Sequence, residues 1–287
     1  MLQVLINPIA GNGRAQRIGA QILRVLSEKN IQHDSCTTEY AGHATLLARR
    51  AAEAGADSVL AVGGDGTVLE TSRGLLGTEA ALGIIPAGTG NDMVKTLGVP
   101  QKPMEALEHI LSHPPRRMDA GTVNGELFLN ACGTGFDVCV LDYAQRAKKY
   151  VQGLLPYLWG VLRALFSFRS IDACIQTAET TLRKPLLVFS IANGRFIGGG
   201  IQIAPLACPD DGKLDMLTID AMPRWRMPLQ LVKLLTGKVL SIPGAVHGRV
   251  ERVCIRAENM RVNVDGEIVS LREAVFEILP EALLAHW

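Results

Sequence analysis

Short apolar segments alternate with amphipathic ones along the first part of the chain. The apolar segments at 2–6, 58–62 and 82–86 have the length of strands and contain mainly Val, Ile, Leu, Ala and Gly. Between and after them, apolar residues recur every three or four positions, which predicts helices. Strands that alternate with helices form parallel sheets, so the pattern predicts a doubly wound α/β domain. We expect its helices at 14–29, 43–54, 67–76, 92–97 and 103–112.

The pattern changes after the His-Pro-Pro sequence at 113–115. An Asn-Gly pair at 124–125 lies between two apolar segments, which predicts a tight hairpin. Helical patterns follow at about 136–167 and 226–235. The other segments are short and are separated by turn residues, which predicts a mainly antiparallel β-sandwich. These strands are expected at 171–177, 186–192, 202–204, 213–219, 250–256, 260–264 and 274–278.

The length and composition fit a globular protein of two domains. The chain has 287 residues, of which 48% are hydrophobic, and a net charge of +1. We expect a nucleotide-binding α/β domain at 1–117, with the tail 280–287 packing back on it, and a β-rich substrate domain at 118–279. So small a net charge gives no overall attraction to nucleic acid, which is not expected as a partner.

Location is predicted from the amino terminus and the cysteines. A strand pattern begins at once, without the basic and apolar regions of a secretory signal. The six cysteines show no metal-type spacing and lie mostly among apolar residues, as reduced thiols do. Both observations predict a cytoplasmic protein.

One apolar segment, at 150–168, raises the question of a membrane. Pro156 and Arg163 interrupt it, and it is shorter than a membrane span, so no transmembrane helix is expected. The simplest interpretation is a core helix with a kink near Pro156. The alternatives are an apolar wall or lid for an acyl chain, or a helix that touches a membrane, with Lys148, Lys149 and Arg163 at its rim.

Three glycine-rich loops follow strands of the first domain. Their sequences are NPIAGNG at 7–13, GGDGT at 63–67 and AGTGND at 87–92. The carboxyl ends of parallel strands meet at one edge of a sheet, where ligands bind, and glycines followed by a helix suit a phosphate. Because Asp65 would repel a bare phosphate, the loops predict a nucleotide that carries Mg²⁺. Neither the complete dinucleotide fingerprint nor a P-loop is present.

Two acidic turns in the second half carry further candidate chemistry. Asp265-Gly266 has the composition of a hairpin turn, but Asp265 could also act as a general base toward an attacking hydroxyl. The acids at 210–211 are either solvated or gathered around a hard cation such as Mg²⁺. Local sequence does not decide between these alternatives.

Taken together, these segments resemble the diacylglycerol kinase catalytic family, and within it the bacterial lipid kinases that are also similar to sphingosine kinases. The matches occur in the family's order over nearly the whole chain. Besides the three loops, they are LNACGTGFD at 129–137, NG followed by GGG at 193–200, APLACPDDGKLD at 204–215 and VDGE at 264–267.

The resemblance implies two domains with a nucleotide in the cleft between them, and it assigns roles to residues. Asp265 would be the proton acceptor, with Glu267 beside it. A Mg²⁺ would be held by Asp211 and by the backbone carbonyls of Cys208 and Lys213. Asp65, Asp92 and Asp137 are candidates for a carboxylate and water network around the Mg²⁺ of the nucleotide. The residues that would line ATP are Asn7, Pro8, Ile9, Ala10, Gly11, Thr38, Gly63, Gly64, Asp65, Gly66, Thr67, Val68, Leu69 and Thr89.

The family resemblance therefore implies an ATP- and Mg²⁺-dependent lipid kinase. It would transfer the γ-phosphate to a hydroxyl of a diacylglycerol-like or phospholipid acceptor at a membrane surface, as a cytoplasmic protein that is peripheral at the inner face. Two alternatives stay open: a related kinase with a soluble acceptor such as NAD, and a non-catalytic nucleotide-binding regulator. The second is favoured by Leu69, which stands where the family commonly has Asn. An exposed strand edge could also make a homodimer.

Overall fold

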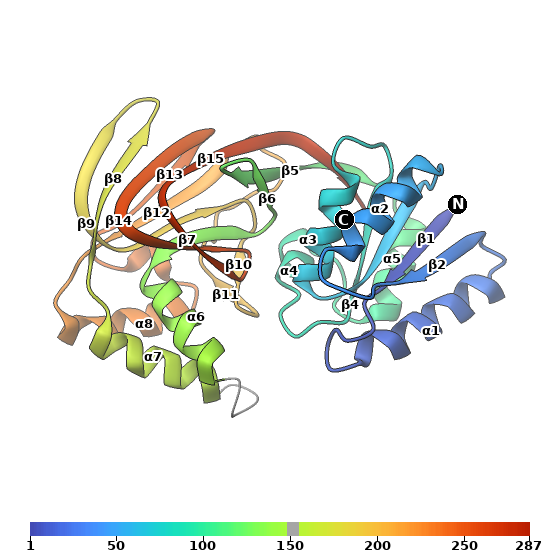
Figure 1. Ribbon diagram of the computed structural model, residues 1–287, viewed down its shortest axis with the longest axis horizontal. Helices are drawn as coiled ribbons and strands as arrows, with labels where there is room; N and C mark the ends of the chain where they lie inside the picture. Colours follow the sequence, from blue (N-terminus) through green and yellow to red (C-terminus); the bar gives the residue numbers. More distant parts are fainter. Residues whose placement is uncertain (148–154) are drawn as a thin grey trace. The chain divides into compact units, whose positions relative to one another are not determined.

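The computed structural model describes residues 1–147 and 155–287 (Figure 1). The chain divides into two compact units. Unit 1 comprises Met1–Ala120, Pro209–Gly212 and Leu279–Trp287, and unit 2 comprises Gly121–Cys208 and Lys213–Ile278. An α/β unit with a parallel sheet is thus followed by a β-rich unit with antiparallel strands, which confirms the expected fold class. The boundary expected at 117 stays a prediction.

Unit 1 is built on a parallel sheet with helices between its strands. The strands pair in the order β4-β3-β1-β2, and β3 and β4 are buried along their whole length. The strands are β1 (Leu2–Ile6), β2 (His33–Thr37), β3 (Ser58–Gly63) and β4 (Ala81–Pro86). The helices are α1 (Arg14–Glu28), α2 (His43–Glu53), α3 (Asp65–Leu75), α4 (Asp92–Leu97) and α5 (Pro103–Ser112).

These helices follow the spacing of apolar residues and the chemistry of their ends. Ile18, Ile22 and Leu26 recur every four residues and form the buried face of α1. Pro103 begins α5, where its missing N–H has no partner in any helix. The helix expected from 67 begins two residues earlier, at Asp65, so the acid of the GGDGT loop belongs to the first turn of α3.

The carboxyl-terminal residues extend the sheet of unit 1. Strand β15 (Glu267–Ala285) reaches β4 at its end, where Ala285 lies parallel to Leu82. The N–H of His286 donates to the Leu82 carbonyl at 2.9 Å. The buried imidazole of His286 forms hydrogen bonds with Ser58 Oγ at 3.0 Å and with the His113 carbonyl at 3.1 Å. Paired backbone and a satisfied imidazole fix the tail on this unit.

Unit 2 is a mainly antiparallel sheet whose strands pair in the order β13-β12-β9-β7-β14-β15. The segments expected at 250–256 and 260–264 belong largely to one strand, β14, which an irregularity between Arg256 and Met260 interrupts. The strands of the sheet are β6 (Glu126–Phe128), β7 (Ala131–Gly135), β8 (Ile171–Thr177), β9 (Thr181–Ala192), β12 (Leu214–Asp220), β13 (Ala245–Val250) and β14 (Arg252–Val264), together with β5 (Arg116–Val123), which begins in unit 1. Strands β10 (Phe196–Ile197) and β11 (Ile201–Gln202) form a separate two-stranded sheet.

Two apolar clusters occupy the two faces of the sheet of unit 2. Phe189 and Ile191 of β9 belong to one cluster, and Val188 and Ala192 to the other, as side chains alternate along a strand. The second cluster is completed by helices, which therefore cover that face (Figure 1). They are α6 (Phe136–Ala147), α7 (Leu155–Ser167) and α8 (Met227–Leu235), with short 3₁₀ turns η1 (Arg224–Arg226) and η2 (Val239–Ser241).

The apolar segment expected to form one kinked helix falls partly outside the described residues. Its first part, 150–154, and the two lysines before it are not described, whereas α7 begins at Leu155. Pro156 is therefore in the first turn of α7, where proline is tolerated, and it kinks no described helix. Among the described residues, no helix has both the length and the apolar character that a membrane crossing requires.

Candidate functional site

The three glycine loops of unit 1 meet at the carboxyl ends of β1, β3 and β4, as expected from a parallel sheet. A Cβ added to Gly11, whose φ is +59°, would lie 2.1 Å from the Ala87 carbonyl oxygen. A Cβ added to Gly88 would lie 2.4 Å from the Cα of Gly64. Such contacts exclude side chains at these positions, so glycine is required for the loops to come together.

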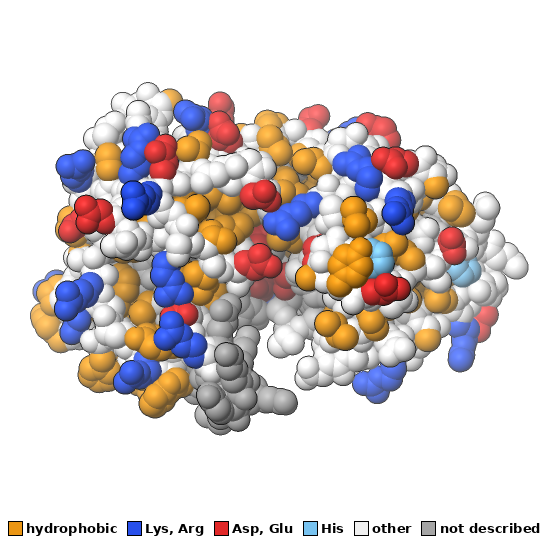
Figure 2. Space-filling view, viewed as in Figure 1, with side chains coloured by type: hydrophobic (Ala, Val, Ile, Leu, Met, Phe, Trp, Pro, Cys, Tyr) orange, Lys and Arg blue, Asp and Glu red, His pale blue; other side chains and the backbone are white. Residues whose placement is uncertain are grey.

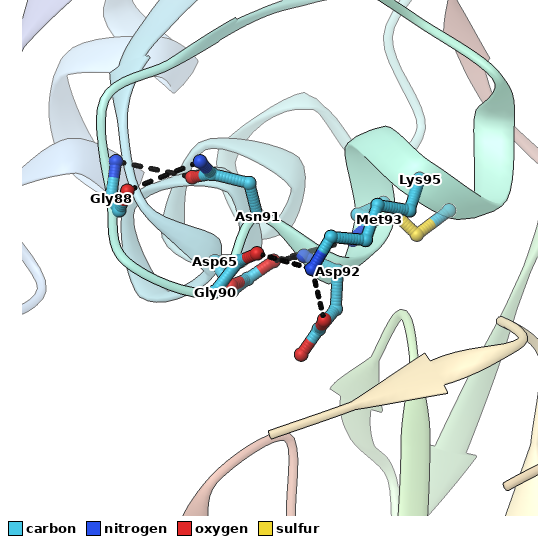
Figure 3. A network of polar contacts seen from close by, with 7 residues as sticks. All are labelled: Asp65, Gly88, Gly90, Asn91, Asp92, Met93 and Lys95. Atoms are coloured by element: carbon cyan, nitrogen blue, oxygen red, sulfur yellow. Dashed lines mark hydrogen bonds and ion pairs between the residues drawn. The ribbon is translucent and has the colours of Figure 1, made fainter. Parts of the chain in front are cut away.

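Side chains of the same loops also join them. Asn7, at the end of β1, donates from Nδ2 to Oγ1 of Thr67 in α3 at 2.9 Å. Its backbone N–H donates to the Val62 carbonyl at 3.1 Å. The Gly88 and Asn91 residues of the third loop exchange two hydrogen bonds of 3.1 Å (Figure 3). The loops thus form one connected surface at the start of α3, where the first N–H groups of a helix have no partner within it.

Asp65 links the second loop to the third (Figure 3). Its Oδ1 accepts the backbone N–H of Asp92 at 2.7 Å and that of Met93 at 3.3 Å, at the first turn of α4. Burial raises the pKa of the Asp65 carboxyl, and the charge of the neighbouring Asp92 raises it further, while the N–H donors lower it. Two carboxylates are therefore held close together at the loop cluster.

Lys95 balances this acidic pair. Its ammonium group donates to the Gly90 carbonyl at 2.8 Å and lies 3.2 Å from Oδ1 of Asp92, and both side chains are largely buried (Figure 3). A buried carboxylate requires a partner of opposite charge, and Lys95 is that partner for Asp92. The cluster therefore offers both carboxylate oxygens, which suit Mg²⁺, and a cation near the place where phosphates would bind.

The other residues expected to line ATP differ in how far their side chains reach the surface. Ile9, Gly66 and Thr89 are exposed at the loop cluster, whereas Thr38 is buried and its N–H donates to the Ile6 carbonyl at 2.9 Å. The side chains that belong to the core are those of Val68 and Leu69, the latter only 7% exposed. Gly63 packs against Thr67, and Pro8, Ala10 and Gly64 are partly exposed.

The apolar character of Leu69 has a structural explanation. An apolar side chain at this position fills the interior of unit 1 instead of facing the loops. Leu69 stands where the family commonly carries a polar residue, and its side chain packs in the core. The contacts of the surrounding loops are intact.

The Asp265 turn lies in unit 2, between β14 and β15. Asp265 adopts a positive φ of 45°, and Gly266 follows it at 101°, as in a tight hairpin turn. Its carboxylate accepts three backbone N–H groups: Leu129 donates to Oδ2 at 2.6 Å, and Asn130 and Ala131 donate to Oδ1 at 3.0 Å. The carboxylate is therefore fixed in position by a segment more than a hundred residues away in sequence.

Asp137 is a second partly buried acid of unit 2. It is in the first turn of α6, where its own N–H and that of Val138 are hydrogen-bonded to it, and its Oδ1 is a buried atom without a partner. Burial raises the pKa of this carboxyl to about 6, against the lowering effect of the two N–H groups. A carboxyl so perturbed is a candidate for a functional role.

The residues expected to hold a separate Mg²⁺ lie on the 208–213 segment. Asp119, which is buried in β5, fixes it: the Asp119 N–H donates to the Pro209 carbonyl at 2.6 Å, and its Oδ2 accepts the Gly212 N–H at 2.7 Å. The Lys213 ammonium pairs with Glu251 at 2.5 Å. A carboxylate and two carbonyl oxygens are donors that suit Mg²⁺, although no three His, Cys, Asp or Glu side chains form a metal site in the described part of the chain.

Sequence patterns missed Lys95 and Asp119. Lys95 stands on the short helix after the third loop, three residues from Asp92, and this spacing was the available signal. Asp119 lies inside β5, between Met118 and Ala120, where a charged residue indicates a buried partner. Its partners, Gly212 and Glu281, come from distant segments.

Comparison with known proteins completes the description of the site. Residues 1–123 match the diacylglycerol kinase catalytic domain, and residues 130–285 match the YegS C-terminal NAD kinase beta sandwich-like domain. The chain belongs to the diacylglycerol kinase catalytic family. The expected resemblance and the expected kinase are confirmed.

Relatives of this kinase cover most of its length. A Chromohalobacter salexigens protein named "Probable lipid kinase YegS-like" is 36% identical to this chain. The match covers 79% of this chain and 74% of that protein. The chain is 28% identical to a Bacillus subtilis "Diacylglycerol kinase" over 92% of this chain and 89% of the relative. A solved Bacillus anthracis structure, described as a candidate diacylglycerol kinase, is similar with a TM-score of 0.83 and 25% identity, over 100% of this chain and 96% of the other.

Proposed function

We propose that this kinase transfers the γ-phosphate of ATP to a hydroxyl group of a diacylglycerol-like or phospholipid acceptor. The observation that carries the proposal is the joined cluster of three glycine loops at the start of α3, in a chain whose relatives are named lipid kinases. The nucleotide would lie against the loops of 7–11 and 63–69, with Thr38 and Thr89 beside them.

Mg²⁺ is proposed as the second component of the reaction. The Asp65 and Asp92 carboxylates at the loop cluster have the donor chemistry that the metal of a nucleotide requires, and Asp137 is proposed as the third acid of this network. The separate Mg²⁺ is assigned to Asp211 and to the carbonyls of Cys208 and Lys213. When bound at the nucleotide, Mg²⁺ neutralises charge on the phosphates that develops during transfer.

Asp265 is the proposed proton acceptor for the attacking hydroxyl, with Glu267 as the second carboxylate of the same turn. The three N–H donors hold the Asp265 carboxylate in one position, which suits the orientation of an acceptor. Glu267 is exposed at the start of β15. The two carboxylates therefore have to be separated by experiment.

The acceptor is proposed to be a lipid presented at a membrane surface, with the kinase in the cytoplasm and peripheral at the inner face. A homodimer that forms through an exposed strand edge is also proposed. A soluble acceptor such as NAD is the alternative that the same loops would serve.

The test compares wild type with Asp265→Asn and Glu267→Gln, with diacylglycerol in mixed micelles or NAD as acceptor. Loss of the general base lowers kcat by about 10²–10⁴ and leaves the Kd of ATP nearly unchanged. We expect this loss in Asp265→Asn with diacylglycerol, and near-normal turnover in Glu267→Gln. The reverse order would assign the base to Glu267, and phosphorylation of NAD alone would replace the lipid acceptor.

Stability has to be measured beside turnover, because Asn cannot accept all three N–H groups as a carboxylate does. A buried N–H left without an acceptor costs about 1–3 kcal/mol. A structural role of Asp265 alone would lower the melting temperature and recover full activity at low temperature. A catalytic role leaves the low kcat in place under those conditions.

A further inference from the structure

Helix α8 is apolar on both of its sides. Met227, Leu231 and Leu234 pack into the cluster under the helix, which accounts for one side. On the other side Trp225 is 75% exposed and Leu229 is 65% exposed, and Val232 and Leu235 continue the row at helical spacing. Single exposed leucines are ordinary, but a surface helix normally presents polar residues on its outer side.

Helix α7 repeats this arrangement on the same face of the sheet. Val161 and Ala164 pack into the same apolar cluster as Met227 of α8. Its outer side carries three exposed apolar residues: Trp159, Leu162 and Phe166, the last 78% exposed. The Arg224 guanidinium before α8 donates to the Phe168 carbonyl after α7 at 3.0 Å, so the two ends are adjacent.

These exposed residues define what we call the α7–α8 face, which Figure 2 shows as orange side chains interspersed with blue ones over this part of unit 2. The face consists of Trp159, Leu162, Phe166, Trp225, Leu229, Val232 and Leu235.

The charged residues within the two segments that carry the α7–α8 face are all basic, and the acids Asp172, Asp220 and Glu251 lie just beyond the ends of these segments. The segments 155–171 and 221–250 contain no Asp or Glu. The Arg226 guanidinium lies 4.8 Å from the centre of the Trp225 ring, and that of Arg163 lies 5.9 Å from that of Trp159. The basic residues of the two segments are Arg163, Arg169, Arg224, Arg226, Lys233, Lys238 and Arg249.

Exposed apolar rows with basic residues beside them distinguish between the possible classes of partner. A second copy of the chain would bring its own basic residues against these, because a two-fold interface joins the same surface of both subunits. Three residues of the face are aromatic, but the other four are Leu or Val, which offer no stacking to nucleic acid bases. Trp, Phe and Leu with surrounding Arg and Lys are the composition of helices that lie in the interface of a membrane with anionic lipids.

We propose that the α7–α8 face docks on the surface of a bilayer that contains anionic phospholipid. Trp225 and Leu229, with their neighbours in the two rows, enter the boundary between headgroups and acyl chains, and the basic residues contact lipid phosphates. The inference deepens the proposed function, because a docked kinase meets a lipid acceptor in the bilayer. Docking itself requires neither ATP nor an acceptor.

The test is sedimentation of the full chain with vesicles, without nucleotide. One set of vesicles is phosphatidylcholine alone, and the other has equal parts of phosphatidylcholine and phosphatidylglycerol. We expect binding to the mixed vesicles, weakened by salt, and little binding to phosphatidylcholine alone. In chains that retain only Trp225 as tryptophan, its fluorescence should shift to shorter wavelength on binding.

Two variants and a matched control locate the surface. Trp225→Ser with Leu229→Ser should lower the partition coefficient at least about ten-fold, because both apolar side chains leave the bilayer boundary. Arg226→Gln with Lys233→Gln should lower it about twenty-five-fold, since each basic residue near an anionic surface contributes about a factor of five. Leu182→Ser with Arg183→Gln makes the same types of change at the exposed start of β9 and should have no effect.

The results that would overturn the proposal are distinct from failure of the kinase proposal. Absence of binding to mixed vesicles, or binding that both variants leave unchanged, removes the docking surface. Altered oligomeric state in the Trp225→Ser and Leu229→Ser chain, without altered vesicle binding, assigns the face to a second copy. Vesicle binding that the variants weaken, in a chain that phosphorylates no lipid, supports docking and rejects the kinase proposal alone.

Discussion

Replacing Asp137 by asparagine should make the protein more stable at neutral pH. Burial raises the pKa of this carboxyl from its ordinary value of 3.8 to about 6. Each pKa unit corresponds to about 1.4 kcal/mol, so ionising Asp137 in the folded chain costs at most about 3 kcal/mol. The folded state binds this proton more tightly than the unfolded state does. Stability therefore falls as pH rises from about 4 to about 6 and stays lower above that range.

The assay is thermal unfolding of wild type and Asp137→Asn between pH 4 and pH 8. For units of this size, a gain of 1 kcal/mol raises the melting temperature by about 2–4 °C. We expect the variant to melt higher by several degrees at pH 8 and at nearly the same temperature as wild type at pH 4. An unchanged or lower melting temperature at pH 8, or a difference independent of pH, would refute the reasoning.

Asp142 on the same helix is the matched control, because its environment has the opposite effect. A hydrogen bond from Arg261 holds the pKa of the Asp142 carboxyl below its ordinary value, and the charges of Arg261 and Arg146 lower it further. Arg261 reaches both carboxylate oxygens, at 3.0 and 3.2 Å. Asp142→Asn should therefore destabilise by about 1.5–3 kcal/mol at neutral pH, with a smaller effect in acid.

Three further predictions concern unit 1. Gly88→Ala, whose Cβ would meet Gly64, should lower the melting temperature and raise the KM for ATP, whereas Gly66→Ala, with no protein atom near its Cβ, should leave the melting temperature unchanged. Burial lowers the pKa of His286, so wild type should lose stability as pH falls below about 6.5; in His286→Gln, thermal unfolding should show a flatter profile between pH 5.5 and pH 8. Asp65→Asn keeps an oxygen for the Asp92 and Met93 N–H groups, so it should fold normally but bind ATP with Mg²⁺ at least about ten-fold more weakly by calorimetry.

If Asp137 serves the nucleotide's Mg²⁺, Asp137→Asn should lower kinase activity while it raises stability. Functional sites commonly retain groups that destabilise the fold. Equal or higher activity in the more stable variant would remove Asp137 from the proposed carboxylate network.

The loop cluster was predictable because its signal is local. Glycines at 11, 63, 64 and 88 follow apolar strand segments, and parallel strands bring the ends of such segments to one edge. The structure then explains the glycines by contacts that exclude a Cβ. Helix positions were equally predictable from spacing, although α3 begins two residues early, since the first turn includes Asp65.

Features that depend on distant segments could not be predicted in this way. The hydrogen-bond partners of Asp265 come from residues 129–131, and those of Asp119 come from residues 209, 212 and 281. The strand β14 runs through an irregularity that looked like a break between two strands, because pairing with β15 continues on both sides of it. The outer rows of α7 and α8 resembled core positions, since apolar spacing alone does not tell which side of a helix is covered.

The central claim is phosphoryl transfer to a lipid by the loop cluster of unit 1. The measurement that tests it most directly is transfer of labelled γ-phosphate from ATP to a total lipid extract in detergent micelles with Mg²⁺, with Asp65→Asn beside wild type. We predict a labelled lipid with wild type and almost none with the variant at a low ATP concentration. No labelled lipid with a wild-type protein that binds ATP, or equal labelling by the variant, would contradict the account.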